Sequence, residues 1–124
     1  MSGPLDSITG SLIARALDAS MTTHQAIANN IANVSTQGYR PVKVAFDDVM
    51  QSMQDAVMSG KSFEDVKQRL AAIDIGPTAD MTQTQVQLDI EMVALAKNTT
   101  HYQALLGARD QLGGLMSLAI KGGR

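Results

Sequence analysis

The chain contains no cysteine and no tryptophan, and only two tyrosines and two phenylalanines among its 124 residues. Without cysteine it cannot form disulfides or use thiolate chemistry, and the common zinc sites built on cysteine are excluded. Aromatic residues make up only 3% of the chain, so the large side chains that usually anchor a globular core are scarce. The composition therefore argues against an ordinary compact globule.

The charge balance and the hydrophobic runs exclude further classes. The formal net charge of −2 gives no basic surface for nucleic acid and no polybasic anchor for a membrane. No apolar run approaches the roughly 18 residues needed to span a bilayer, so no direct membrane insertion is expected. The N-terminus has no basic segment followed by an apolar one, so no cleaved secretory signal is expected. The chain is 44% hydrophobic, mostly Ala, Leu, Ile, Val and Met, which suits helix–helix packing in a single domain.

The first forty residues predict a long helix with an apolar face. Apolar and small residues recur at alternating steps of four and three, at Ile13, Leu17, Ser20, His24, Ile27, Ile31 and Val34. This heptad pattern is typical of helices that pack in coiled coils and bundles, although Ser20 and His24 stand where leucine would be expected. Gly38 is expected to end the helix, and Pro41 prevents its continuation because it biases Arg40 toward extended conformations.

Residues 86–124 predict a second long helix with the same spacing. Its heptad positions are Leu88, Met92, Leu95, Thr99, Tyr102, Leu106, Arg109, Gly113, Met116 and Ile120. A second apolar line runs beside this one, and a helix with two apolar lines needs a bundle or an assembly to bury both. Gly113 and Gly114 are expected either to fray or kink the helix, or to let a neighbouring backbone approach closely.

The segment between the helices is weaker in pattern. Alternation over residues 42–46 predicts a short extended stretch, and residues 47–58 are weakly helical in pattern. Ser62 with Asp65 three positions later resembles a capping box and predicts the start of a short helix. Because the segment has little apolar content, we expect it to be a small, irregular and partly mobile insert.

The predicted fold class is therefore mainly α, with the N- and C-terminal helices paired as a coiled-coil-like hairpin. The chain is divided into residues 1–40, the N-terminal helix and its turn, residues 41–85, the irregular middle, and residues 86–124, the C-terminal helix. This division follows from the contrast between the heptad pattern of the two ends and the weaker, less apolar pattern of the middle.

No constellation of residues predicts catalysis or metal binding. His24 and His101 are the only histidines, and neither has Asp, Glu or Cys at a diagnostic helical offset. Asp89 and Glu91 lie two apart and face differently on a helix, so they are better explained as favourable charges near a helix start. No nucleophile elbow, phosphate-binding loop or dinucleotide fingerprint is present. We predict no catalytic, cofactor-binding or metal site.

The most unusual stretch is ANNIANVSTQGYR, residues 28–40, because it places three asparagines in one helical run. Asn29, Asn30 and Asn33 are middling to poor helix formers, since their amides compete for backbone hydrogen bonds. An amide in a helical seam finds its hydrogen bonds across an interface. We therefore expect this stretch to face a partner surface and its amides to set the register of packing.

This stretch resembles the N-terminal signature of flagellar axial proteins, the rod, hook and hook-associated group, in the form A-x-N-I-A-N-x-x-T-x-G-Y. The matching residues are Asn30, Ile31, Ala32, Asn33, Thr36, Gly38 and Tyr39. Residues 86–106, VQLDIEMVALAKNTTHYQALL, resemble the C-terminal signature of the shortest proximal-rod type in that family. The matching residues there are Val86, Leu88, Asp89, Glu91, Met92, Asn98, Tyr102 and Gln103. The second block lacks the V-x-E-M-x-x-M-I pattern of longer axial proteins, which favours the shortest type over the second proximal-rod type.

The resemblance implies a structural subunit of the bacterial flagellar basal-body rod, not an enzyme and without a cofactor. It implies export through the flagellar type III apparatus without a cleaved signal, and assembly in the periplasm with other rod subunits and basal-body proteins. In such proteins the terminal helices pack into the axial tube. The signature and the heptad positions predict an assembly interface at Ile27, Asn30, Ile31, Asn33, Gly38, Tyr39, Leu88, Met92, Leu95, Asn98, Tyr102 and Leu106.

A soluble helical adaptor or secretion chaperone that buries another protein's helix is the alternative. It accounts for the amphipathic helices and the acidic balance, but not for the Thr36–Tyr39 motif. The two hypotheses differ in solution, because a rod subunit is expected to be a monomer with mobile ends and an adaptor a stable, protected dimer.

Overall fold

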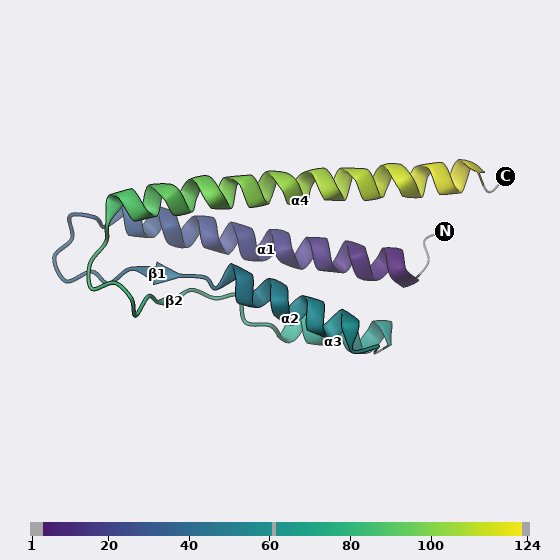
Figure 1. Cartoon of the computed structure of the whole chain (residues 1–124), viewed down its shortest axis with the longest axis horizontal. Helices are drawn as coiled ribbons and strands as arrows, with labels where there is room; N and C mark the ends of the chain where they lie inside the picture. Colours follow the sequence, from purple (N-terminus) through teal and green to yellow (C-terminus); the bar gives the residue numbers. More distant parts are fainter. Residues whose placement is uncertain (1–3, 61, 123–124) are drawn as a thin grey trace.

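The computed structural model describes residues 4–60 and 62–122, and it is mainly helical. Its elements, in order, are α1 (Pro4–Ala32), β1 (Val42–Lys43), α2 (Phe46–Met58), α3 (Phe63–Ala72), β2 (Thr78–Ala79) and α4 (Leu88–Gly122). The two long helices α1 and α4 lie side by side and run antiparallel, so the start of α1 and the end of α4 lie at the same end of the molecule (Figure 1). The predicted mainly-α fold with paired terminal helices is confirmed.

Helix α1 is the centre of the fold, with α4 along one side and the α2–α3 pair along the other (Figure 1). Its Ala16 and Ala19 are almost fully buried, and their small side chains let α2 and α3 approach closely. The buried cluster that joins the three helices comprises Ala16, Ala19, Val49, Met53, Val66 and Leu70. Burying one of its large apolar side chains stabilises the fold by roughly 1.5–3 kcal/mol. The core therefore lies between α1 and the middle segment.

The middle segment is helical because it packs on α1. The extended stretch expected over residues 42–46 is shorter in the structure, since β1 ends at Lys43 and α2 begins at Phe46. In α2 the buried residues recur at steps of four and three, which gives the helix one apolar face. The predicted cap of α3 is confirmed, because the Ser62 hydroxyl accepts a hydrogen bond from the Asp65 amide at 3.3 Å. Whether the segment is partly mobile stays a prediction.

Strands β1 and β2 form a two-residue antiparallel ladder that ties the start of the middle segment to its end. Val42 pairs with Ala79 and Lys43 with Thr78. Beyond the ladder, the Asp80 amide donates to the carbonyl of the buried Pro41 at 2.9 Å. The chain that enters the middle segment after α1 and the chain that leaves it toward α4 therefore lie next to each other at this ladder.

The carboxylate of Asp80 organises the turn that follows β2. It accepts hydrogen bonds from the Thr82 hydroxyl at 2.6 Å, the Thr82 amide at 3.0 Å and the Gln83 side chain at 3.0 Å. The Lys43 ammonium lies 3.9 Å from the same carboxylate. The hydroxyl of Thr82 is the main reason that the pKa of Asp80 lies below its ordinary value of 3.8, and burial opposes it only in part.

The glycines expected to end or kink the two long helices do neither in the structure. Helix α1 ends at Ala32, before Gly38, which instead takes a positive φ of 78° in the turn that follows. Helix α4 runs through Gly113 and Gly114 without a break. A methyl group at either glycine would meet nothing within 4 Å in the described chain. The kink expected there is not seen, and no close approach within this chain explains the pair.

Candidate assembly surface

The Asn30 side chain joins three elements at the end where α1 leads into β1. Its amide nitrogen donates to the Val42 carbonyl at 2.7 Å and to the Glu91 carboxylate at 3.1 Å. Its amide oxygen accepts from the Val42 N–H at 2.9 Å. Asn30 is 1% exposed and Glu91 is 4% exposed, so these bonds are shielded from water and a lost partner would be costly.

A second amide contact lies near the middle of the helix pair. The Ser20 hydroxyl donates to the Asn98 side-chain oxygen at 3.1 Å, and the Asn98 amide donates to the Ser20 carbonyl at 3.0 Å. Both side chains are buried. The serine that interrupts the heptad pattern of α1 is thus matched by an asparagine of α4. We call the Asn30–Glu91 and Ser20–Asn98 contacts together the amide clasp.

The amide clasp fixes the register of α4 on α1. Sliding one helix by a turn would leave several buried polar groups without partners, at a cost of roughly 1–3 kcal/mol each. Asn30 and Asn98 therefore face an interface within the chain, and an assembly interface that includes these residues stays a prediction. Asn30, Asn98 and the buried Ile27 support the shape of the subunit and do not lie on its surface.

The remaining residues of the predicted interface fall into three groups. Leu88 and Met92 are exposed on α4, with 46% and 52% of their surface accessible. Half-buried side chains are those of Ile31, Asn33, Tyr39, Leu95, Tyr102 and Leu106. Gly38 is exposed in the turn. The structure thus buries or half-buries nine of the twelve predicted residues and leaves Leu88, Met92 and Gly38 exposed.

The signature turn builds a compact cap after α1. The Asn33 side chain donates to the Asn29 carbonyl at 2.8 Å, and the Thr36 hydroxyl donates to the Asn33 side chain at 3.1 Å. The Tyr39 amide donates to the Thr36 carbonyl at 3.2 Å. Asn33 therefore satisfies backbone groups that the helix end would otherwise leave free.

Sequence reasoning missed Glu91 as part of this site. Its position in the first turn of α4 does suit the helix dipole, as expected, but its side chain is buried against Asn30. The sequence signal that could have identified Glu91 is its spacing of seven from Asn98 in α4, which places both side chains on one face of the helix. The buried face passes through Glu91 and Asn98 and not through Leu88 and Met92, because the polar clasp and not the strongest apolar line faces α1.

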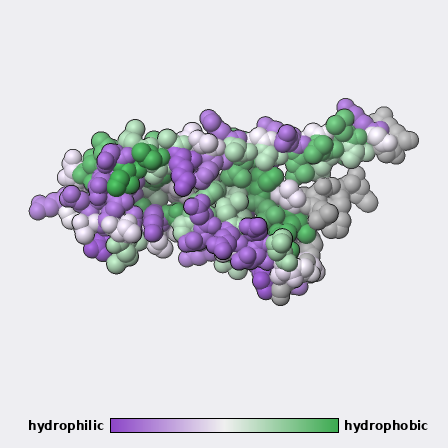
Figure 2. All heavy atoms as spheres, in the orientation of Figure 1, coloured by the Kyte–Doolittle hydropathy of each residue, from purple (hydrophilic) through white to green (hydrophobic). Residues whose placement is uncertain are grey.

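Apolar side chains remain on the surface of α4 at both of its ends. Those near its start are Leu88, Ile90, Met92 and Val93, and those near its end are Leu115, Leu118 and Ile120. On the face drawn in Figure 2, apolar atoms gather between α4 and α2 and toward the C-terminal end of α4. Unpartnered apolar faces of this extent mark interaction surfaces.

The residues that carry polar chemistry are dispersed. Within the described ranges there is no group of three or more His, Asp or Glu side chains placed to hold a metal ion. His24 is exposed, and His101 stacks on Phe46 with ring centroids 4.8 Å apart. No helix within those ranges combines the length and hydropathy that crossing a bilayer requires.

Comparison with known proteins agrees with the signature and with the helix pair. A family described as flagella basal body rod protein matches residues 14–40, which span the second half of α1 and the turn after it. The flagellar basal body rod protein FlgB of Bacillus subtilis (strain 168) is 27% identical over 116 residues, which cover 88% of this chain and 90% of that protein.

The chain is thus similar to the flagellar basal body rod proteins, in agreement with the resemblance carried by its signature. Within that class, the similarity that extends along nearly the whole chain is to FlgB.

Proposed function

We propose that this protein is a structural subunit of the proximal flagellar rod, of the FlgB type, which assembles by packing its terminal helices with those of neighbouring subunits. The observation that carries the proposal is the pair α1–α4, joined by a buried amide clasp while apolar side chains stay exposed on α4. The matches to rod proteins support the same role.

The amide clasp suits a subunit that must present the same surface in every copy. A hydrophobic seam alone tolerates slippage, whereas buried amides penalise every register but one. Subunits with a fixed register stack with identical contacts, and a stack of identical contacts transmits torque without slipping. The exposed apolar residues of α4 then supply the area buried between subunits.

The partners in this proposal are other rod subunits and basal-body proteins, together with the flagellar type III export apparatus. The subunit passes through that apparatus without a cleaved signal and assembles in the periplasm. The described chain is mostly helical, so most of its backbone hydrogen bonds can form again locally after export, before the helices pack.

Deletion of the gene tests the role directly. Deletion is expected to abolish swimming and to stop basal bodies before a complete rod, and a tagged copy should co-purify with basal bodies. Normal swimming in the deletion strain would overturn the proposal.

A surface variant tests the assembly part. Leu88→Asp with Met92→Asp introduces two charges on exposed apolar positions of α4, so the subunit should fold but incorporate into basal bodies at least about tenfold less, since burying a charge at an interface costs several kcal/mol. The matched control is Gln103→Asp with Gln111→Asp, which adds the same charge at exposed polar positions of the same helix. Equal incorporation of both variants would exclude this face from assembly.

A further inference from the structure

An apolar groove of about 680 Å³ runs between α1, α2 and α4 on one side of the molecule. Its lining includes Leu12 and Ile13 of α1, Met50, Met53 and Met58 of α2, and Leu105 of α4. Met53 at its base is buried, whereas Met50 and Met58 on its rim are exposed. Unbranched methionines adapt their shape to an incoming apolar side chain, as at other binding surfaces.

The C-terminal end of α4 has the complementary character. We define the α4 tip as residues 115–121. Leu115 and Leu118 lie three positions apart on one side of the helix and are 65% and 66% exposed. Leu112 and Met116, the half-buried residues of this part of α4, lie on a neighbouring side of the helix, about 110° round from that of Leu115 and Leu118, and a Cβ built at Gly10 of α1 would lie 4.0 Å from the Leu112 side chain. The tip therefore presents an exposed apolar ridge that its own subunit leaves uncovered.

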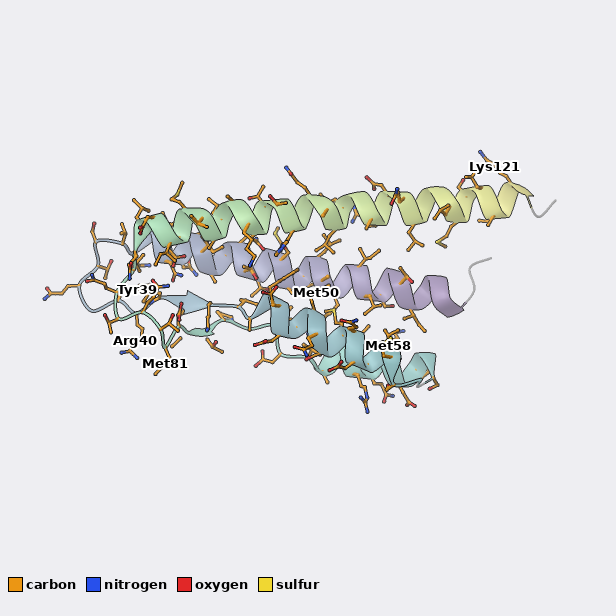
Figure 3. The ribbon with its side chains drawn as sticks, in the orientation of Figure 1. Tyr39, Arg40, Met50, Met58, Met81 and Lys121 are labelled. Carbon is orange, nitrogen blue, oxygen red and sulfur yellow. The ribbon has the colours of Figure 1, made fainter. Side chains whose placement is uncertain are left out.

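Charges on the two surfaces are opposite. Helix α2 carries Asp47, Asp48 and Asp55 and no basic residue, and Asp47 lines the groove. After Asp110 the only charged side chains in the sequence are Lys121 and Arg124. Lys121 projects from the end of α4 (Figure 3). Asp47 pairs with Lys97 at 3.9 Å, and both side chains are largely exposed, so that pair opposes a competing cation weakly.

We propose that the groove of one copy of this chain receives the α4 tip of a second copy, with Leu115 and Leu118 against the methionine rim and Lys121 near the acidic start of α2. The proposal rests on the rod function proposed above and names the surfaces that meet in it. Groove and tip are different surfaces of one chain, so the contact is head-to-tail. Repetition of a head-to-tail contact builds an open helical polymer and not a closed two-fold dimer.

Disulfide trapping tests the contact, because the chain has no cysteine of its own. Basal bodies are prepared from cells whose only copy carries Leu118→Cys together with Met58→Cys, or Leu118→Cys together with Met50→Cys, and are oxidised. We expect at least one of these pairs to yield multimers on non-reducing gels, and each single-cysteine variant to stay monomeric. The matched control joins Leu118→Cys with Gln68→Cys, an exposed position of α3 that does not line the groove.

The outcomes separate the contact from the function. If the variants enter basal bodies but the groove pairs give no more multimer than the Gln68 control, the contact is wrong and the rod role stands. If the unmodified protein is absent from basal bodies, the rod role is wrong. In that case the same cysteine pairs are tested in the purified chain at high concentration. Multimers would support the contact, and their absence would overturn it.

A charge exchange gives an independent measurement that does not depend on cysteines. Lys121→Glu and Asp47→Lys alone should each lower incorporation into basal bodies several-fold, and the two together should restore it, because the opposite charges are exchanged and not removed. Both positions are exposed, so the fold should persist in all three variants. A double variant that incorporates no better than the poorer single variant would contradict the contact.

Discussion

At the scale of single residues, Asn29 and Asn30 are chain neighbours with opposite environments. Asn29 is exposed on α1, whereas Asn30 is buried and bonded to Val42 and Glu91. From residue type alone, the two asparagines would be expected to contribute equally to stability. Only the direction in which each side chain leaves the helix decides which one holds the fold together.

The pair provides a matched test of the amide clasp. Asn30→Ala should lower the free energy of unfolding by about 3 kcal/mol, because it leaves the buried Glu91 carboxylate and Val42 backbone groups without their partner. Asn29→Ala should change it by less than about 0.5 kcal/mol, since that side chain faces solvent and alanine is the better helix former. Urea denaturation of both variants measures the difference, and equal effects would show that the clasp does not stabilise the chain.

The lowered pKa of Asp80 predicts a pH dependence of the turn after β2. Because the folded-state pKa is lowered, the ionised carboxylate contributes stability above its ordinary pKa of 3.8 and loses that contribution as pH falls through the folded value. Asp80→Asn should therefore speed hydrogen exchange of the Thr82 amide near pH 6, and this difference from the unchanged protein should shrink below about pH 3.8. Rates are compared at matched pH, and a difference that grows toward acid would contradict the assignment.

At the scale of elements, α4 differs from α1 in how much of it is covered. Helix α1 is contacted by every other helix, whereas the last turns of α4 keep Leu115, Leu118 and Ile120 exposed. Gly113 and Gly114 come just before these turns and meet nothing in the described chain. A glycine pair that costs helix stability without relieving a contact within the subunit is consistent with a role at a neighbouring one.

Replacing these glycines separates helix stability from assembly. Gly113→Ala and Gly114→Ala should each stabilise α4 by up to about 1 kcal/mol, because alanine loses less backbone entropy in a helix. Hydrogen exchange of the amides of α4 measures this gain. Gly107→Ala is the control, since that glycine also lies in α4 in open space. If the backbone of a neighbouring subunit approaches Gly113 and Gly114, the variants at these two positions should incorporate poorly into basal bodies and the Gly107 variant should not. Normal incorporation of all three would leave the pair without an assembly role.

At the scale of the whole molecule, the subunit is a long helix pair with a smaller helical layer on one side (Figure 1). The buried cluster lies between α1 and that layer, while α4 is held by the amide clasp and by half-buried apolar residues. Stability is therefore unevenly distributed, highest along α1 and lowest at the end of α4.

This distribution predicts the behaviour of the purified protein. It should be a monomer in dilute solution, with strong hydrogen-exchange protection around Ala16–Ala26 of α1 and little after Leu115. The connections in residues 73–87 should exchange faster than α1, which would support the expected mobility of the middle segment. Sedimentation and exchange together measure this. A stable dimer protected along all of α4 would instead favour the adaptor hypothesis.

Much of the fold could be predicted from the sequence because it depends on local pattern. The heptad spacing of the two ends indicates two long helices, and Ser62 with Asp65 indicates the start of α3. The packing of α2 and α3 on α1 could not be predicted in the same way. Their few apolar residues form a core only because Ala16 and Ala19 of α1 lie opposite them. The hydrophobic pattern of one segment does not show which surface of another segment it packs against.

The sequence by itself determined the terminal helices, the signature turn and the resemblance to flagellar rod proteins, since each rests on residues close together in the chain. Only the tertiary structure decided what the asparagines do. Asn30 meets Glu91 and Ser20 meets Asn98 across 61 and 78 positions, and no local pattern encodes which heptad positions of two antiparallel helices face one another. The register is set by the demand that buried polar groups be paired, and within the subunit that demand is met by side chains of α1 and α4 that lie far apart in the sequence.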